Sequence, residues 1–431
     1  MADLPPLNHQ DAILQYISSN FVSVKESDKT FYKGHLEFVV TNLIKNMKDV
    51  DIFFCTMFQR DEVAGSFWDG LKIGKPVEFD KNFVLRLPRC FMNSIQFLPA
   101  LPSFVLVNVK RGFADLQRSD KWEQYKGHPH YSSSGRAPPA GARPRRPLPG
   151  PSGRRPNLPR KIESWLDRDG NIISDKVRFW MESVIVRAVD SFPSYSNAGW
   201  SYKLSTRKAG PAMTVEVEIN PGSRQFNIDI VPAFEFQPAA WPKHIRPYPK
   251  NIPDAVWHVV PKPIKPNESE SGANRSNYGP DIQWRLSFHN QESYRIHDKF
   301  HLKAVLKLIK KMRDVKLDQD MLCSYAIKTV FLWEMDDHDD SFWQRGLSVT
   351  FLHMLNVLVK FLRSGNLPFY WQKEHNLLGK LKEVQRDQLF RTVQRIQNQI
   401  HHGLRNEDWL VIAREILTDE EFHQLEGSFD I

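Results

Sequence analysis

The sequence predicts an α/β lobe built on a mixed sheet, followed by a helical lobe, with a cleft between the two. With 431 residues and 41% hydrophobic content, the chain can bury a large core, and two lobes are the expected outcome. Strand-like segments fill the middle of the chain, whereas helical periodicity runs from Lys299 onward. Strands interleaved with helices are typical of an α/β lobe.

The strand signals occupy the region between residues 53 and 288. Runs of β-branched and aromatic residues predict strands at 53–58, 77–87, 104–109, 213–219, 225–236 and 282–288. A helix is expected among them at 175–189. The mixture indicates a single sheet with helices packed on it.

Helical periodicity flanks the strands on both sides. In 8–48 it is broken near 25–33, and 35–47 places its apolar residues on one stripe, so we expect a long helix that braces the back of both lobes. The later helices are expected at 299–313, 321–333, 341–362 closed by Gly365, 387–401 closed by Gly403, and 418–425. We divide the chain into an N-terminal helical segment (1–50), a core (51–295) and a C-terminal helical lobe (296–431).

One segment of the core, residues 132–161, has a different composition from the rest. It holds eight basic residues, eight prolines and no acidic residue, so removing it takes the formal net charge from +9 to +1. Such a segment lacks the apolar residues for a packed core, and we expect a disordered, partly polyproline insertion. It is either a bare linker or an arginine-rich tether for nucleic acid.

The most informative motif begins at Gly65 and ends at Asp80. Gly65 permits close approach of backbone to a phosphate, and Ser66 follows it at the expected start of a short helix, where anions are favoured. Glu78 and Asp80 are spaced i, i+2, so on a strand both side chains project from the same face. Two adjacent carboxylates hold hard divalent cations such as Mg²⁺.

A third carboxylate comes from the segment 224–232. Alternating Phe226, Ile228 and Ile230 predict a strand with one buried face, which sends Asp229 to the other face. We therefore expect Asp229 to join Glu78 and Asp80 in a site for two Mg²⁺ or Mn²⁺ ions. Such a site activates an attacking hydroxyl and stabilises a leaving pyrophosphate.

This order of motifs resembles the cyclic GMP-AMP synthase-like receptors, within the Mab-21 family of nucleotidyltransferases. The resemblance covers roughly residues 35–380, apart from the insertion. It implies that the first lobe is the nucleotidyltransferase lobe, that Ser66 and the lysine Lys310 hold the donor triphosphate, and that Asp229 assists deprotonation of a ribose hydroxyl. It also implies nucleotide contacts at Arg285, Ser287, Ser324, Tyr325 and Asn376.

The resemblance also bears on the activating ligand. The vertebrate synthase has a His/Cys zinc loop after the strand that carries Ser287, whereas 288–293 holds no cysteine. We therefore expect no zinc, and double-stranded RNA rather than DNA as the ligand. Its binding surface is expected to combine Lys45 and Lys48 of the long helix with Lys303, Lys307 and Lys311.

The function that follows is synthesis of a cyclic dinucleotide from ATP and GTP on nucleic-acid binding. Two alternatives stay open: a Mab-21-like scaffold without activity, and a synthase of linear oligonucleotides. No leader or membrane-spanning run is evident, and the three cysteines are widely separated, so we expect a cytoplasmic protein. The sequence leaves oligomerisation on the ligand open.

Two further clusters have simple structural interpretations. The acidic run 336–340, which includes His338, is similar to a metal site, yet it precedes a predicted helix, where acidic residues cap the N-terminus. The His401 and His402 pair lies at a predicted helix end. We expect capping at both places.

Overall fold

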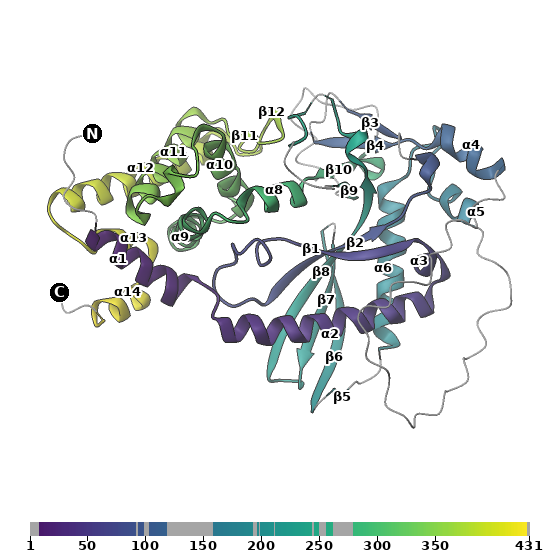
Figure 1. Cartoon of the computed structure of the whole chain (residues 1–431), viewed down its shortest axis with the longest axis horizontal. Coiled ribbons are helices and arrows are strands. Elements are labelled where there is room, and N and C mark those ends of the chain that lie inside the picture. Colours follow the sequence, from purple (N-terminus) through teal and green to yellow (C-terminus); the bar gives the residue numbers. More distant parts are fainter. Residues whose placement is uncertain are drawn as a thin grey trace.

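The computed structural model describes residues 8–91, 94–98, 103–118, 158–192, 196–197, 199–210, 212–243, 245–249, 256–261 and 279–428. A lobe that contains the sheet and a lobe made of helices lie side by side along the long axis of the molecule (Figure 1). The predicted two-lobed α/β and helical architecture is confirmed.

A ten-stranded mixed sheet forms the first lobe, and its longest strand, β8 (Arg224–Phe236), lies at its centre. One path through the sheet runs β3-β4-β10-β9-β8-β7-β6-β5, while β2 pairs with β8 in parallel and β1 pairs with β2 antiparallel. The other strands are β1 (Phe58–Ala64), β2 (Glu78–Leu85), β3 (Ile95–Phe97), β4 (Phe104–Val107), β5 (Ser196–Asn197), β6 (Trp200–Ala209), β7 (Ala212–Ile219), β9 (Trp257–Pro261) and β10 (Trp284–Ser287).

The two faces of β8 differ as the sequence predicts. Phe226, Ile228 and Ile230 are buried, whereas Asn227 and Asp229 are only partly buried. The apolar face packs on the helices α2 (Glu26–Val50) and α6 (Ser174–Asp190), which also pack on each other. Helices therefore cover the apolar face of the sheet and leave the face with Asp229 toward the second lobe (Figure 1).

One predicted strand, 53–58, is wrong. The structure has helix α3 (Ile52–Met57) there, and strand β1 begins only at Phe58. The Asp51 side chain accepts a hydrogen bond from the backbone N–H of Phe54 at 2.9 Å, which caps the new helix. A cap of this kind decides between helix and strand for a short apolar run.

Eight helices and a small hairpin make up the described part of the second lobe. The helices are α1 (Asn8–Ile17), α8 (His289–Ile296), α9 (Phe300–Lys316), α10 (Ser324–Asp337), α11 (Leu347–Ser364), α12 (Glu383–Arg405), α13 (Val411–Ile416) and α14 (Asp419–Glu426), and the hairpin joins β11 (Pro368–Phe369) to β12 (Gln372–Asn376). Helix α11 is long and apolar enough to span a bilayer by length and composition, but more than half of it is buried in this lobe.

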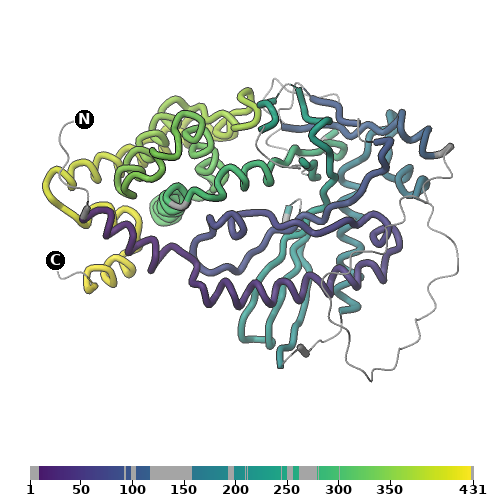
Figure 2. The backbone as a smooth tube through the Cα atoms, viewed as in Figure 1, coloured from purple at the N-terminus to yellow at the C-terminus, as the bar shows by residue number. Residues whose placement is uncertain are grey.

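The first helix belongs to the second lobe, although its sequence precedes the sheet. Helix α1 packs against α11 and α13, and the Asp11 carboxylate accepts the backbone N–H of Ser348 at 2.7 Å. Figure 2 shows this start of the chain beside the C-terminal helices before the chain continues into α2. Helix α2 packs on α3 and α6, and residues of its first turns line a pocket together with Lys307 of α9, so its expected bracing of both lobes stays a prediction.

Most of the predicted insertion, residues 132–157, lies outside the described residues. Its last four residues, 158–161, begin helix α5 (Leu158–Glu163). Leu158 is buried, and the Lys161 ammonium lies 5.3 Å from the centre of the Trp180 ring. The boundary set at 161 is therefore too late, because the core resumes at Leu158.

Gly403 does not close a helix, contrary to the prediction from its sequence position. It is buried inside α12, where a Cβ atom would lie 2.6 Å from Val411 of α13. Gly365 does end α11, with a left-handed φ of 63°. The glycine in α12 thus serves close helix packing rather than chain reversal.

Two glycine substitutions should have opposite effects on stability. Gly34→Ala in α2 meets nothing within 4 Å, so it should raise the free energy of unfolding by about 0.5–1 kcal/mol through helix propensity. Gly403→Ala should lower it, because Val411 cannot withdraw without displacing α13. Urea denaturation followed by circular dichroism measures both, and a stabilising Gly403→Ala would contradict the packing role.

Candidate active site

Three carboxylates lie on neighbouring strands on the face of the sheet toward the helical lobe. Asp80 of β2 is directly opposite Asp229 of β8 in the parallel register, and Glu78 is opposite Asn227. Because side chains alternate along a strand, Glu78, Asp80 and Asp229 share one face. The structure thus brings together the three acids that the sequence singled out.

Neighbouring strands fix the position of Asp229. Thr214 of β7 is its antiparallel partner, and the Thr214 hydroxyl donates a hydrogen bond to one Asp229 carboxylate oxygen at 2.6 Å. Strand β8 is held on both edges here, by β2 and by β7. The carboxylate is therefore oriented by rigid elements rather than by a loop.

A tight turn connects β1 to the approach of β2 and covers the acids. Gly65 has a left-handed φ of 80°, and a Cβ atom at this position would lie 1.8 Å from an Asp80 carboxylate oxygen. Only glycine allows the turn to pass so close to Asp80. Ser66 begins a series of hydrogen-bonded turns rather than the expected helix, and its carbonyl accepts the Leu71 N–H at 2.7 Å.

The crowding of like charges changes the acidity of Asp80. The surrounding protein withdraws water from its carboxylate, and Asp229 and Glu78 repel its charge, which together raise the pKa of Asp80 from 3.8 to about 6. Lys72 opposes this shift and contacts Glu78 at 3.1 Å. A cation placed between the acids would relieve the same repulsion.

A buried charge network ties the turn to the helical lobe. The Lys328 ammonium of α10 lies 2.8 Å from the Asp69 carboxylate of the turn and 3.0 Å from the Glu292 carboxylate of α8. These three side chains are at most 10% exposed. The turn that covers the acids is therefore anchored to two helices of the other lobe.

Further hydrogen bonds complete this network. Glu292 accepts hydrogen bonds from the Tyr325 hydroxyl at 2.6 Å and from the Trp371 indole at 2.9 Å. Burial opposes the charge on Lys328, but Glu292 and Asp69 outweigh it and raise the lysine pKa. The Lys328 ammonium therefore stays charged at neutral pH.

Comparison with known proteins identifies the fold that carries these acids. The sequence model described as the Mab-21 protein nucleotidyltransferase domain matches residues 67–297, more than half of the chain. The chain belongs to the Mab-21 family. The Mab-21 protein HhH/H2TH-like domain matches residues 301–395, within the helical lobe.

Similar proteins within this family have been described in insects. The chain is 28% identical to a cyclic GMP-AMP synthase-like receptor of Ctenocephalides felis, over 96% of this chain and 88% of the relative. It is 29% identical to one of Tribolium castaneum, over 95% and 92%, and 27% identical to receptor 2 of Drosophila melanogaster, over 90% and 77%. The resemblance that the motifs indicate is thus confirmed, and the chain carries a Mab-21 nucleotidyltransferase domain.

Lys310, which we expected to hold the donor triphosphate, instead contacts the backbone of the turn that follows Ser66. Lys310 is buried, and its ammonium donates to the Leu71 carbonyl at 2.7 Å. Burial, with some repulsion from Arg313, lowers the pKa of Lys310 to about 8. In this conformation the lysine supports the backbone that follows Ser66.

The other predicted nucleotide contacts divide into two groups. Arg285 and Ser287 share one face of β10, and both are partly buried. Ser324 accepts a hydrogen bond from Arg313 at 2.9 Å. The Asn376 amide is engaged by the backbone of Gly365 and of two neighbouring leucines, so it holds the hairpin in place.

The sheet face also carries a polar group that sequence reasoning missed. Arg60 donates to both Glu62 and Glu235, and the buried His258 lies 3.4 Å from Glu62. These residues come from β1, β8 and β9. Glu235 lies six residues after Asp229 on β8, so the alternation of side chains along a strand puts both on the same face. This alternation could have predicted the position of Glu235 from the sequence.

The predicted nucleic-acid surface is only partly formed. Lys45 and Lys48 are exposed on α2, but Lys307 donates to Ser23 and Lys311 is paired with Glu421 at 2.7 Å. Lys303 likewise donates to the His297 carbonyl. The surface expected from all five lysines stays a prediction, and on binding nucleic acid the three lysines of α9 would exchange contacts that they now make within their own chain.

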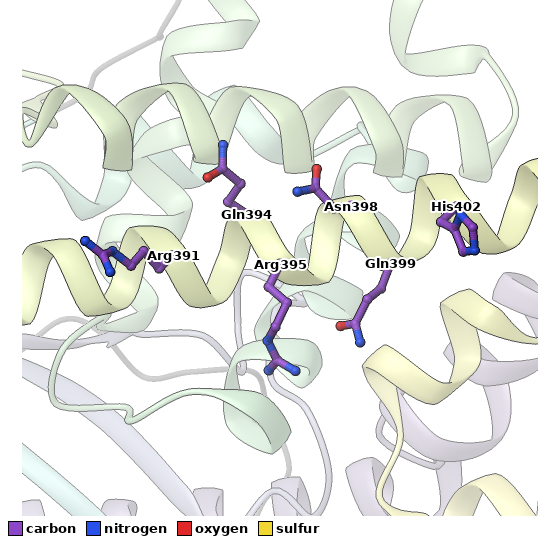
Figure 3. A pocket seen from close by; sticks show the side chains of 6 residues that line it. All are labelled: Arg391, Gln394, Arg395, Asn398, Gln399 and His402. Atoms are coloured by element: carbon purple, nitrogen blue, oxygen red, sulfur yellow. The ribbon is translucent and has the colours of Figure 1, made fainter.

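The distance between these lysines bears on the same predicted surface. Lys307 lines a pocket of about 620 Å³ together with Lys29 at the beginning of α2. Lys45 is sixteen residues further along that helix, about 24 Å at 1.5 Å per residue. Another pocket, lined by polar side chains of α12, is remote from the acids (Figure 3).

The raised pKa predicts that removing one charge stabilises the metal-free protein. A folded-state pKa above the ordinary value gives stability that is full below about pH 3.8 and is lost as the pH rises through about 6. Asp80→Asn should therefore raise the melting temperature at pH 7.5 by about 2 °C, a value reduced for solvent screening. At pH 5 the difference should shrink.

Glu78→Gln is the matched control for this substitution. Glu78 is exposed and paired with Lys72, so the repulsion of Asp80 that its neutralisation relieves is offset by the loss of this pair, and no net gain is expected. Differential scanning calorimetry in the presence of a chelator measures all three proteins. Equal melting temperatures for wild type and Asp80→Asn at pH 7.5 would refute the predicted repulsion.

Proposed function

We propose that this protein joins ATP and GTP into a cyclic dinucleotide of the cyclic GMP-AMP type, as a nucleic-acid-activated enzyme of innate immunity. The observation that carries the proposal is the register of Glu78, Asp80 and Asp229 beneath the Gly65 turn. The printed names of the relatives, cyclic GMP-AMP synthase-like receptors, support the product class.

The three acids fit a pair of hard divalent ions. Glu78, Asp80 and Asp229 offer only oxygen donors, and the repulsion that raises the pKa of Asp80 is the kind that a bound cation removes. They would hold two Mg²⁺ or Mn²⁺ ions. When bound, such ions activate the attacking hydroxyl and neutralise charge on the triphosphate.

The side chains and backbone around the acids orient the reactants. The turn at Gly65 and Ser66 brings backbone N–H groups close to the acids, where they bind the donor triphosphate. Thr214 holds one Asp229 oxygen at 2.6 Å, which leaves the other to accept the proton of a ribose hydroxyl. Lys72, 3.1 Å from Glu78, adds positive charge at the edge of the same site.

The proposed base contacts come from strand β10 and helix α10. Arg285 and Ser287 on β10 face the acceptor base and its phosphate. The Tyr325 hydroxyl is bonded to Glu292, which fixes its ring where a donor base would stack. Lys310 acts through the backbone of the turn in the observed conformation.

Double-stranded RNA is the proposed activator. The segment that follows Ser287 forms helix α8 without a cysteine, so it cannot supply the zinc loop of the vertebrate synthase. Lys45 and Lys48 remain exposed on α2 to contact phosphates. Duplex RNA is recognised mostly through its backbone and 2′-hydroxyls.

Product analysis tests this proposal against its alternatives. Purified protein is incubated with labelled ATP and GTP, Mg²⁺ or Mn²⁺, and duplex RNA or duplex DNA of equal length. A single cyclic species that requires RNA is expected. A ladder of products would indicate a linear synthase, and no product under any condition would favour a scaffold protein.

Asp229→Ala should abolish nucleotide transfer without unfolding the protein. Removing a metal ligand deletes charge stabilisation that is realised mainly in the transition state, so activity should fall by at least about 1000-fold. Arg207→Ala, at an exposed pair with Glu216 on β6, is the control and should retain activity. A folded Asp229→Ala protein with wild-type turnover would contradict the site.

Charge reversal on α2 should weaken RNA binding. Lys45→Glu with Lys48→Glu should reduce affinity for duplex RNA and flatten its salt dependence, because fewer counterions are released. Lys311→Glu is a control, since Lys311 is paired with Glu421, and its RNA affinity should change less. Fluorescence anisotropy at several salt concentrations measures this, and unchanged binding by the double variant would exclude this face.

A further inference from the structure

A group of three metal-binding side chains lies outside the active site, on the helical lobe. Glu334 and His338 of the α10 end are one helical turn apart, and His353 comes from the neighbouring helix α11. Their ligand atoms all lie within 4.8 Å of one another. The site joins two helices that are separate in sequence.

Both imidazoles point the same nitrogen at the same carboxylate oxygen. The Nε2 atom of His353 is 2.7 Å from Glu334 Oε2, and the Nε2 atom of His338 is 3.3 Å from it. Donors around a tetrahedral ion at about 2.1 Å lie about 3.4 Å apart. His338 already has this spacing, and His353 needs to move by less than about 1 Å to exchange its hydrogen bond for a metal bond.

An aromatic ring holds the two histidines in this orientation. The His338 ring stacks on Phe342 with ring centres 4.0 Å apart and an interplanar angle of 13°, and His353 meets Phe342 at 4.8 Å. The planes of the two imidazole rings meet at an angle of 78°. The donors therefore converge from two directions without needing an ion to order them first.

The acidic run around His338 separates into distinct roles. Asp336 binds Arg295 at 2.7 Å and also Arg246, while Asp339 caps the turn at Phe342, as predicted for this run. These carboxylates are engaged elsewhere. His338 neither caps a helix nor pairs with a basic side chain among these contacts, and its Nε2 atom faces Glu334.

The other group of potential ligands, on the sheet, is already neutralised. Arg60 donates to both Glu62 and Glu235, so a guanidinium balances the carboxylates beside His258. Among the described contacts of Glu334, both ion-pair partners are imidazoles and neither is an arginine or lysine. A cation can therefore enter this site without displacing a fixed positive charge.

We propose that Glu334, His338 and His353 form a binding site for a divalent transition-metal ion of the Zn²⁺ class. Two imidazoles with one carboxylate favour Zn²⁺ over Mg²⁺, which prefers oxygen donors. The side chains are 13–30% exposed, so the ion enters from solvent and water fills the remaining coordination position. A bound metal ion would link the C-terminal end of α10 to α11. Helix α10 also carries Tyr325 and Lys328 near its N-terminal end.

Zinc titration of the protein without an affinity tag tests the site. After treatment with a chelator and its removal, competition with a chromophoric zinc indicator at pH 7.5 should show one tight equivalent. His353→Ala and His338→Ala should each weaken it by about 100-fold or more, since even loss of a supporting residue costs 10–100-fold. Zinc should raise the melting temperature of the wild type but not that of His353→Ala or His338→Ala.

Controls separate this site from general histidine binding. His423→Ala removes an exposed His–Glu pair at 3.2 Å that belongs to no three-ligand group among the described residues, and it should leave zinc affinity unchanged. His353→Gln serves if the alanine variant does not fold. No tight equivalent in the wild type, or binding that survives both His353→Gln and His338→Ala, would overturn the proposal.

Discussion

The buried ion network around Lys328 is the interaction on which the candidate site depends. One ammonium lies between the Asp69 carboxylate of the turn and the Glu292 carboxylate of α8. A buried charge that loses its partner costs about 3–5 kcal/mol, so the three groups keep each other in place. Because the network joins the turn at 66–71 to α8 and α10 of the helical lobe, it holds this turn in place against the sheet.

The network matters because the acids beneath the turn repel one another. The strand register places Asp80 opposite Asp229, and the left-handed Gly65 lets the backbone approach Asp80. Neither feature is favourable by itself: like charges are crowded, and the backbone adopts a conformation that few residues allow. The rigid sheet and the anchored turn together hold an arrangement that becomes favourable when cations bind.

Local patterns were enough to predict the acids and the fold class. The i, i+2 spacing of Glu78 and Asp80, and the alternation around Asp229, each depend on neighbouring residues alone, and the structure preserves both. The later helices follow their periodicity in the same way. By contrast, a capping bond from Asp51 turned an expected strand into α3, and packing against Val411 placed Gly403 inside a helix.

Contacts between distant segments were beyond these patterns. Asp69 and Lys328 are 259 residues apart and bond in the core, although a single lysine among the apolar residues of α10 was a usable signal for a paired buried charge. The three α9 lysines are spaced as a solvated face would be, yet each donates to a group elsewhere on its own chain. Spacing shows which residues share a face but not what occupies that face.

Hydrogen exchange of a Lys328→Met variant tests the central claim most directly. Without the ammonium, Asp69 and Glu292 lose their common partner, so the backbone amides of the turn at 66–71 should exchange faster while those of β7 and β8 keep their protection. Lys203→Met, at an exposed pair with Glu218, should change neither region. Unchanged exchange in the turn of a folded Lys328→Met protein would contradict the account.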